Sequence, residues 1–143
     1  MRAGNPISQS TGLLLVYAAK LHRSVVAHRL GQAGLHVGQD LVLLELEDSE
    51  GLSQRELADR LRVVQATVGV ALRRLESAGF VRRRPAADDA RVRNALLTEK
   101  GEAALYDIQD AWRAAEEMLT GRLSGHQATD LRRALMSVLD DKP

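Results

Sequence analysis

The sequence predicts a mainly α-helical fold with one small β-hairpin, and three observations support this class. Apolar residues recur at helical spacing over most of the chain. Residues 80–84 and 92–97 are suited to two short strands, and residues 85–90 to the turn that joins them. The chain contains no cysteine, which excludes a disulfide scaffold, a cysteine zinc site and thiol redox sensing.

Length and composition indicate one folded domain. The chain has 143 residues, of which 45% are hydrophobic, so it can bury one core but is too short for two independent domains. No segment approaches the roughly 18 consecutive apolar residues of a membrane span. Residues 1–11 lack the pattern of a signal peptide. We therefore expect a soluble, cytoplasmic protein with no membrane partner.

The charge is unevenly distributed along the chain. Residues 53–100 hold eleven Lys or Arg and six Asp or Glu, whereas the rest of the chain is net acidic. A basic middle between acidic flanks suits a polyanionic partner such as nucleic acid. An ordinary solvated surface explains the charges equally well, so charge alone does not decide the function.

The first part of the chain predicts two helices. Residues 13–30 form a dense apolar run with polar residues at helical intervals, which favours a long, mostly buried helix. Gly31 and Gly34 follow this run, and glycine commonly ends a helix. A second helix is expected over residues 39–48, closed by Gly51.

Two further short helices precede the hairpin. Ser53 with Glu56 three residues later is the pattern of a capping box, in which each side chain binds the other residue's backbone N–H. The next helix is expected over residues 64–77 and is followed by Gly79. After the hairpin, Thr98 is expected to cap the first of two C-terminal helices.

Two short helices joined by a tight turn and followed by a hairpin form a winged helix-turn-helix. An α-helix fits the major groove of DNA, while the preceding helix and the wing contact the backbone on either side. Arg and Lys contacts to phosphate supply most of the affinity, and base edges supply the sequence information. The predicted fold class is therefore mainly α with a small β-hairpin wing, flanked by N- and C-terminal helices.

Several separate blocks of the sequence resemble the MarR (multiple antibiotic resistance regulator) family and keep its spacing. Residues 51–61 are similar to the helix before the turn, and residues 63–81 to the recognition helix and the start of the wing. Residues 83–101 are similar to the rest of the wing and the start of the next helix. The outer helices match only in pattern. The resemblance implies one MarR-like domain over residues 1–143, with a winged helix-turn-helix DNA-binding region at 35–97 and helical dimerisation regions at 8–34 and 98–140.

The resemblance implies a homodimeric, sequence-specific DNA-binding transcription regulator that acts as a repressor. In many members of the family, a small anionic or aromatic ligand releases the repressor from DNA. The twofold symmetry of a dimer implies a pseudo-palindromic site in double-stranded DNA. The sequence names neither ligand nor operator, and it predicts no cofactor. A protein-interaction module without base reading is the alternative, since Gly69 and Val70 stand where the family usually has longer polar side chains.

Thirteen residues are expected at the DNA interface. A helical wheel turns Gly69, Val70 and Arg73 outward, and we expect Arg73 to make the main charged contact from this face. Gln65 and Thr67 begin the recognition helix, where they either reach bases or phosphate or simply cap the helix. The full set is Ser53, Gln54, Arg55, Gln65, Ala66, Thr67, Gly69, Val70, Arg73, Arg84, Asp89, Arg91 and Arg93.

The predicted wing is rich in arginine. Its arginines are Arg82, Arg83, Arg84, Arg91 and Arg93. Strand alternation puts Arg82 and Arg84 on one face of the hairpin and Arg83 on the other. The resemblance implies that Asp89 pairs with Arg91 at the tip and aims a cation at the minor groove, although Ala90 stands where the family usually has an arginine.

No metal or catalytic site is expected. The histidines, which are His22, His28, His36 and His126, include no pair at the i, i+4 spacing of a helical metal site. A composite zinc site shared across a dimer is the alternative. Ser124, His126 and Asp130 are close in sequence, but a helix start leaves them exposed and unsupported, unlike a catalytic triad. Trp112 is expected in the core or the dimer interface, with a ligand pocket as the alternative.

Overall fold

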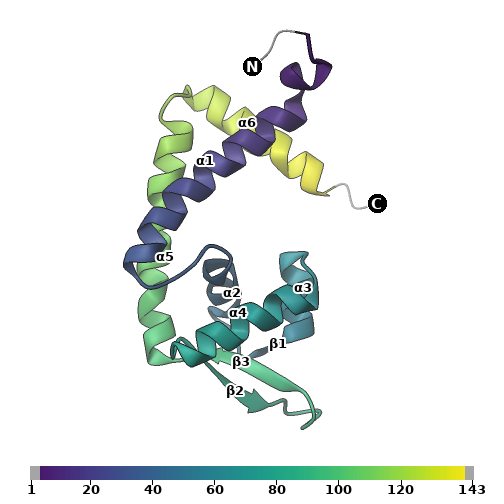
Figure 1. Ribbon diagram of the computed structural model, residues 1–143, viewed down its shortest axis with the longest axis vertical. Coiled ribbons are helices and arrows are strands. Elements are labelled where there is room, and N and C mark those ends of the chain that lie inside the picture. Colours follow the sequence, from purple (N-terminus) through teal and green to yellow (C-terminus); the bar gives the residue numbers. More distant parts are fainter. Residues whose placement is uncertain (1–3, 141–143) are drawn as a thin grey trace. The chain divides into compact units, whose positions relative to one another are not determined.

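The computed structural model describes residues 4–140 and confirms a mainly helical chain with a small antiparallel sheet (Figure 1). The elements in order are a 3-10 helix η1 (Pro6–Gln9), α1 (Thr11–Gln32), α2 (Gln39–Leu46), β1 (Leu52–Ser53), α3 (Gln54–Leu61), α4 (Gln65–Ser77), β2 (Val81–Pro85), β3 (Arg93–Leu97), α5 (Glu99–Thr120) and α6 (Gly125–Asp140). The chain forms two compact units, which we name the helical unit (residues 4–25 and 112–140) and the winged unit (Val26–Ala111).

Helix α1 continues through Gly31 and ends at Gln32, so the expectation that Gly31 ends it is wrong. Gly34 is the terminating glycine. It has a φ of +76°, and its N–H donates to the carbonyl of Gly31 at 3.2 Å. The Leu35 N–H donates to the Leu30 carbonyl at 2.9 Å, which completes the hydrogen-bond pattern of a Schellman motif.

Much of α1 is exposed in the single chain, contrary to the expectation of a mostly buried helix. Only Val26 and Leu30 of this helix are buried. Leu14 and Leu21, in the helical unit, are 53% and 55% exposed. An apolar helix is buried only where a second surface covers it, and composition alone does not say whether that surface belongs to the same chain. No helix among residues 4–140 combines the length and hydropathy needed to cross a membrane.

The wing is a three-stranded sheet in the order β1-β3-β2, and the sequence predicted only two of its strands. The third, β1, pairs Leu52 with Ala95 and Ser53 with Asn94. The strand has only two residues, which is too short for an alternating pattern. Helix α2 also ends earlier than expected, at Leu46, because Glu47 has an extended ψ of 135°, and Asp48 follows with left-handed backbone at a φ of 58°.

The helices of the winged unit enclose a leucine-rich core. The apolar positions recur at the three- and four-residue spacing that turns one helical face inward. Leu43, Leu57 and Leu72, from α2, α3 and α4, are each fully buried. Ala95 on the central strand is also fully buried, so the sheet packs against the same core. This packing fixes α4 relative to α3 and to the wing.

The junction between α4, the wing and α5 is tightly built. Gly79, with a φ of +84°, ends α4 as predicted. Thr98 caps α5 as predicted, since its hydroxyl accepts from the Gly101 N–H at 3.1 Å and donates to the Gly79 carbonyl at 2.6 Å. A β-carbon on Gly101 would lie 2.1 Å from the Phe80 carbonyl oxygen, so no larger residue fits there without backbone movement.

Gly101→Ala is therefore expected to destabilise the chain by about 2 kcal/mol or more, because the added methyl group overlaps backbone atoms that cannot easily move. Gly31→Ala is the matched control, since a β-carbon there meets no atom within 4 Å. Ala has a higher helix propensity than Gly, so this control is expected to stabilise by up to about 1 kcal/mol. Urea unfolding of both variants measures the two effects, and equal responses would contradict the prediction.

Candidate nucleic-acid interface

The helix-turn-helix begins with a capping box that confirms the sequence prediction. The Ser53 hydroxyl accepts from the Glu56 N–H at 3.1 Å, and the Glu56 carboxylate accepts from the Ser53 N–H at 2.7 Å. The hydrogen bond from the Ser53 backbone is the main cause of the lowered pKa of Glu56. Arg55, the second residue of α3, is exposed. The box fixes the start of α3 beside β1.

The turn between α3 and α4 is made by a residue other than glycine. Arg62 has left-handed backbone with a φ of 55° and ends α3. Its N–H and that of Val63 both donate to the Ala58 carbonyl. Helix α4 then begins after Val64, whose side chain cannot accept a hydrogen bond from the first turn. The expected start of α4 thus shifts by one residue to Gln65.

Gly69 does not face outward, and that expectation is wrong. Gly69 is buried, because the side chain of Gln54 lies over it. A β-carbon at position 69 would come within 2.8 Å of the Gln54 Nε2 atom. That Nε2 donates to the Gln65 carbonyl at 2.9 Å. The helical wheel missed this contact, since the covering residue comes from the preceding helix.

The remaining outward positions of α4 are exposed as the wheel predicts. Val70 is 40% exposed, and Ala66 and Arg73 are also exposed. Gln65 and Thr67, at the start of α4, lie exposed beside them. This surface therefore combines small apolar side chains with one flanking cation.

Three wing arginines hydrogen-bond to backbone carbonyls. Arg83 donates to the Arg93 carbonyl at 3.0 Å, and Arg93 donates back to the Arg83 carbonyl at 3.5 Å. Arg84 donates to the Glu50 carbonyl at 2.6 Å. Burial lowers the pKa of Arg83. The contacts of Arg83 and Arg93 join the two strands of the hairpin, and Arg84 ties the hairpin to the segment before β1; the number of charges alone did not suggest these roles.

The wing tip carries the ion pair that the resemblance implied. The Arg91 Nε atom lies 3.2 Å from the Asp89 carboxylate, and the Arg91 backbone N–H donates to the same oxygen at 3.1 Å. The side-chain hydrogen bond from Arg91 is the main cause of the lowered pKa of Asp89. The Arg91 side chain is nevertheless 91% exposed, so its charge stays available to a partner.

A hollow of about 510 Å³ beside the C-terminal half of α4 was not predicted. It brings Arg73 together with two residues that the sequence did not single out for binding, His36 and Gln39. The lining residues are Gly34, His36, Gln39, Arg73, Arg74, Ser77 and Ala78. No sequence signal marks Gln39, because a polar residue at the start of a helix is common.

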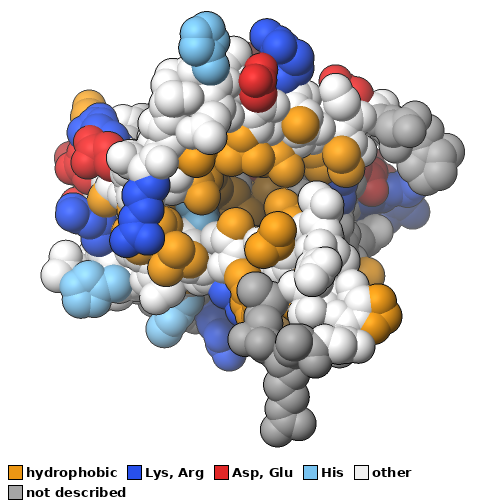
Figure 2. Space-filling model, turned by 90° about the horizontal axis from the view of Figure 1, so that it is seen from above, with side chains coloured by type: hydrophobic (Ala, Val, Ile, Leu, Met, Phe, Trp, Pro, Cys, Tyr) orange, Lys and Arg blue, Asp and Glu red, His pale blue; other side chains and the backbone are white. Residues whose placement is uncertain are grey.

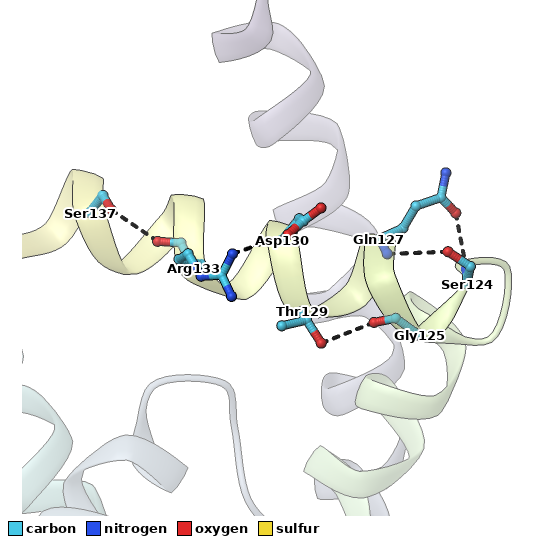
Figure 3. Close-up of polar contacts among 7 residues, drawn as sticks. All are labelled: Ser124, Gly125, Gln127, Thr129, Asp130, Arg133 and Ser137. Carbon is cyan, nitrogen blue, oxygen red and sulfur yellow. Dashed lines mark hydrogen bonds and ion pairs between the residues drawn. The ribbon is translucent and has the colours of Figure 1, made fainter.

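The structure gives no catalytic arrangement to Ser124 and Asp130. Figure 3 shows that Ser124 instead forms a reciprocal cap with Gln127, through hydrogen bonds of 3.0 and 3.2 Å. Asp130 pairs with Arg133 at 3.4 Å. Within residues 4–140 no three His, Cys, Asp or Glu side chains gather as a metal site. In the helical unit, His22 packs edge-on against Trp112, with ring centroids 4.8 Å apart.

The short helices, the turn and the three-stranded wing define a winged helix-turn-helix protein. The MarR family model matches residues 35–92. Over 130 residues the chain is 32% identical to the HTH-type transcriptional repressor Rv2887 of Mycobacterium tuberculosis (strain ATCC 25618 / H37Rv), covering 91% of this chain and 94% of that protein. The chain therefore belongs to the MarR family.

Solved structures agree with this assignment. The crystal structure of Mycobacterium tuberculosis Rv2887 in complex with DNA is 31% identical and has a TM-score of 0.74, over 90% of this chain and 97% of that one. Bordetella bronchiseptica BpsR, whose DNA binding is regulated by 6-hydroxynicotinic acid, shares the fold with a TM-score of 0.87 at 21% identity, over 98% and 100% of the two chains. The relatives are transcription regulators, so the family is not one of enzymes, as the sequence predicted.

The contact of Gln54 with Gly69 predicts a non-additive pair of substitutions. Gly69→Ala alone displaces the Gln54 amide, so a gain of about 1 kcal/mol in helix propensity is offset by the loss of one hydrogen bond of about 1 kcal/mol. In a Gln54→Ala background the same substitution is expected to stabilise by about 1 kcal/mol. Urea unfolding of the four proteins measures the coupling, and strictly additive free energies would rule the contact out.

Proposed function

We propose that this chain is a homodimeric repressor that binds a pseudo-palindromic site in double-stranded DNA. Each winged unit would read one half-site, with α4 in the major groove and the wing tip at the adjacent minor groove. The observation that carries the proposal is the exposed face of α4, together with the exposed Arg91 at the wing tip. The 31% identity to Rv2887, whose structure was solved in complex with DNA, supports the same use of this surface.

The exposed side chains of α4 favour recognition of DNA shape and of thymine methyl groups over base recognition by charged side chains. Ala66 and Val70 can pack against thymine methyl groups at the floor of the major groove. Gln65 can pair with adenine from the start of the helix. Arg73 would add a charged contact at the other end of this face. Such a surface reads few bases directly, so part of the specificity is expected from DNA shape.

An exposed apolar face supports the dimer. On α1, Leu14, Leu15, Val16, Tyr17 and Leu21 are each about half exposed or more, and on α6 Met136, Val138 and Leu139 are similarly exposed. Figure 2 shows hydrophobic side chains gathered on the face seen there. Large apolar side chains exposed together commonly mark an interaction site. A second copy of the chain is the occupant that the family resemblance implies.

Release from DNA by a small anionic or aromatic ligand also belongs to the proposal, on the strength of the family resemblance, and so does a cytoplasmic location. A protein-interaction module without base reading is the second candidate. One of the two residues that favoured it was Gly69, which is buried beneath Gln54 and does not form part of the outer surface. Val70 still leaves the helix face apolar at its centre.

Selection of bound duplexes from a random pool at physiological salt tests the proposal. We expect one enriched pseudo-palindrome with half-sites about one helical turn, or ~34–36 Å, apart. Sedimentation of the same complex is expected to give two chains per duplex. Recovery of no preferred sequence, together with binding that vanishes as salt rises, would instead favour the protein-interaction candidate.

Arg73→Ala is expected to weaken binding to specific and random duplexes by a similar factor. It is also expected to reduce the slope of log affinity against log salt by about one, because one cation no longer displaces a counterion. Arg122→Ala is the control, since Arg122 is exposed in the turn between α5 and α6 of the helical unit. An unchanged slope in Arg73→Ala would show that this residue makes no phosphate contact.

A further inference from the structure

The hollow beside α4 has a lining that suits an anion. Its charged side chains are Arg73 and Arg74, and His36 adds an imidazole, while none of its lining residues is acidic. The winged unit also has a hollow of about 480 Å³ with the opposite character, whose acidic lining residues are Glu47, Asp48, Glu99 and Glu102. The sign of the charge therefore distinguishes the two hollows, and only the first is complementary to phosphate or carboxylate.

The Gln39 side chain, held in place by the loop before α2, gives this hollow a second feature. Gln39 is only 7% exposed, and its Oε1 atom accepts from the His36 backbone N–H at 3.0 Å. A backbone N–H can only donate, so the atom facing it must be the oxygen and the amide nitrogen must point elsewhere. Among residues 4–140 the structure records no hydrogen bond from the Gln39 Nε2 group, and this donor is not among the buried unpaired atoms, so it is open to solvent where Gln39 lines the hollow. A solvent-accessible amide N–H can donate to an acceptor that enters the hollow.

We propose that this hollow binds a phosphate of the DNA backbone, held between the Gln39 amide of α2 and the Arg73 guanidinium of α4. His36 adds a further donor from the loop before α2. The phosphate would receive one charged and at least one neutral hydrogen bond from two different elements. Two elements that grip one phosphate also fix how far α4 can slide along the groove, which is the positioning role of backbone contacts.

The place of the hollow favours a DNA phosphate over a free small anion. Arg73 and Ser77 lie on the same face of α4 as Ala66 and Val70, since their spacing is three, four and seven residues. A duplex that receives this face in its major groove brings a backbone strand to its edge. The inference therefore rests on the proposed function, because it takes the same face of α4 as the one that meets DNA.

Gln39→Glu is the sharpest test. The Glu carboxylate still accepts from the His36 N–H, so the loop keeps its hydrogen bond, but an acceptor replaces the donor that faces the hollow. A carboxylate in the first turn of α2 also suits the helix dipole, so the melting temperature is expected to change little. We expect the affinity for both the selected operator and random duplex to fall about 10-fold, with their ratio unchanged.

Gln109→Glu is the matched control, because it adds the same charge in the acidic hollow. This variant is expected to change DNA affinity less than about twofold. Gln39→Glu with an affinity within twofold of the parent chain would overturn the inference while leaving the proposed function intact. A parent chain that prefers no sequence would overturn the proposed function alone, provided that the effect of Gln39→Glu on non-specific binding persists. A parent chain that binds no DNA would overturn both.

Two further measurements keep the inference falsifiable if Gln39→Glu does not fold. Ser77→Glu places a carboxylate at the rim of the hollow from α4, without touching the loop, and is expected to weaken DNA binding in the same uniform way. Thermal melting in inorganic phosphate tests the free-anion source. Stabilisation of the parent chain by millimolar phosphate that Ser77→Glu abolishes, with DNA affinity unchanged in that variant, would assign the hollow to a small anion and overturn the inference.

Discussion

The packing of Gln54 over Gly69 is the contact on which the presentation of α4 depends. A helix-turn-helix works only if its second helix is held at a fixed angle to the first, and here the first residue of α3 bonds to the first carbonyl of α4 at 2.9 Å. The absence of a side chain at Gly69 lets the two helices approach this closely. Below this contact, Leu57 and Val68 are almost completely buried and join the same two helices to the core. The hydrogen bond and the core contacts therefore hold α3 and α4 in one relative orientation.

The arginines of the wing divide into two groups with different physical roles. Arg83, Arg84 and Arg93 donate to backbone carbonyls, which do not neutralise their charge but do restrict where each guanidinium can reach. Arg91 keeps almost its whole side chain in solvent, while Asp89 orients it and partly offsets its charge. The number of phosphate contacts, and hence the salt dependence, is therefore expected to be smaller than a count of wing arginines suggests.

The sequence predicted features that depend on neighbours within one element, and it missed features that depend on distant residues. The capping box at Ser53 and the terminating Gly79 were correct, because each is local chemistry over a few residues. Gly69 was placed outward because a helical wheel does not see a side chain arriving from the preceding helix. The burial of α1 was overestimated, since an apolar pattern does not say which chain covers it. The hollow beside α4 joins residues separated by more than thirty positions, and no periodicity links them.

Helix α4 has two residues that are unfavourable for helix formation, and both lie near the surface proposed to bind DNA. Val64 provides no side-chain cap for its first turn, and Gly69 lowers its helix propensity; each costs on the order of 1 kcal/mol. The buried face of α4 and the terminating motif at Gly79 offset these costs. Because the buried face and the C-terminal end stabilise α4, its first turn forms without a side-chain cap. Locally unfavourable residues are expected where binding, rather than folding, sets the requirement.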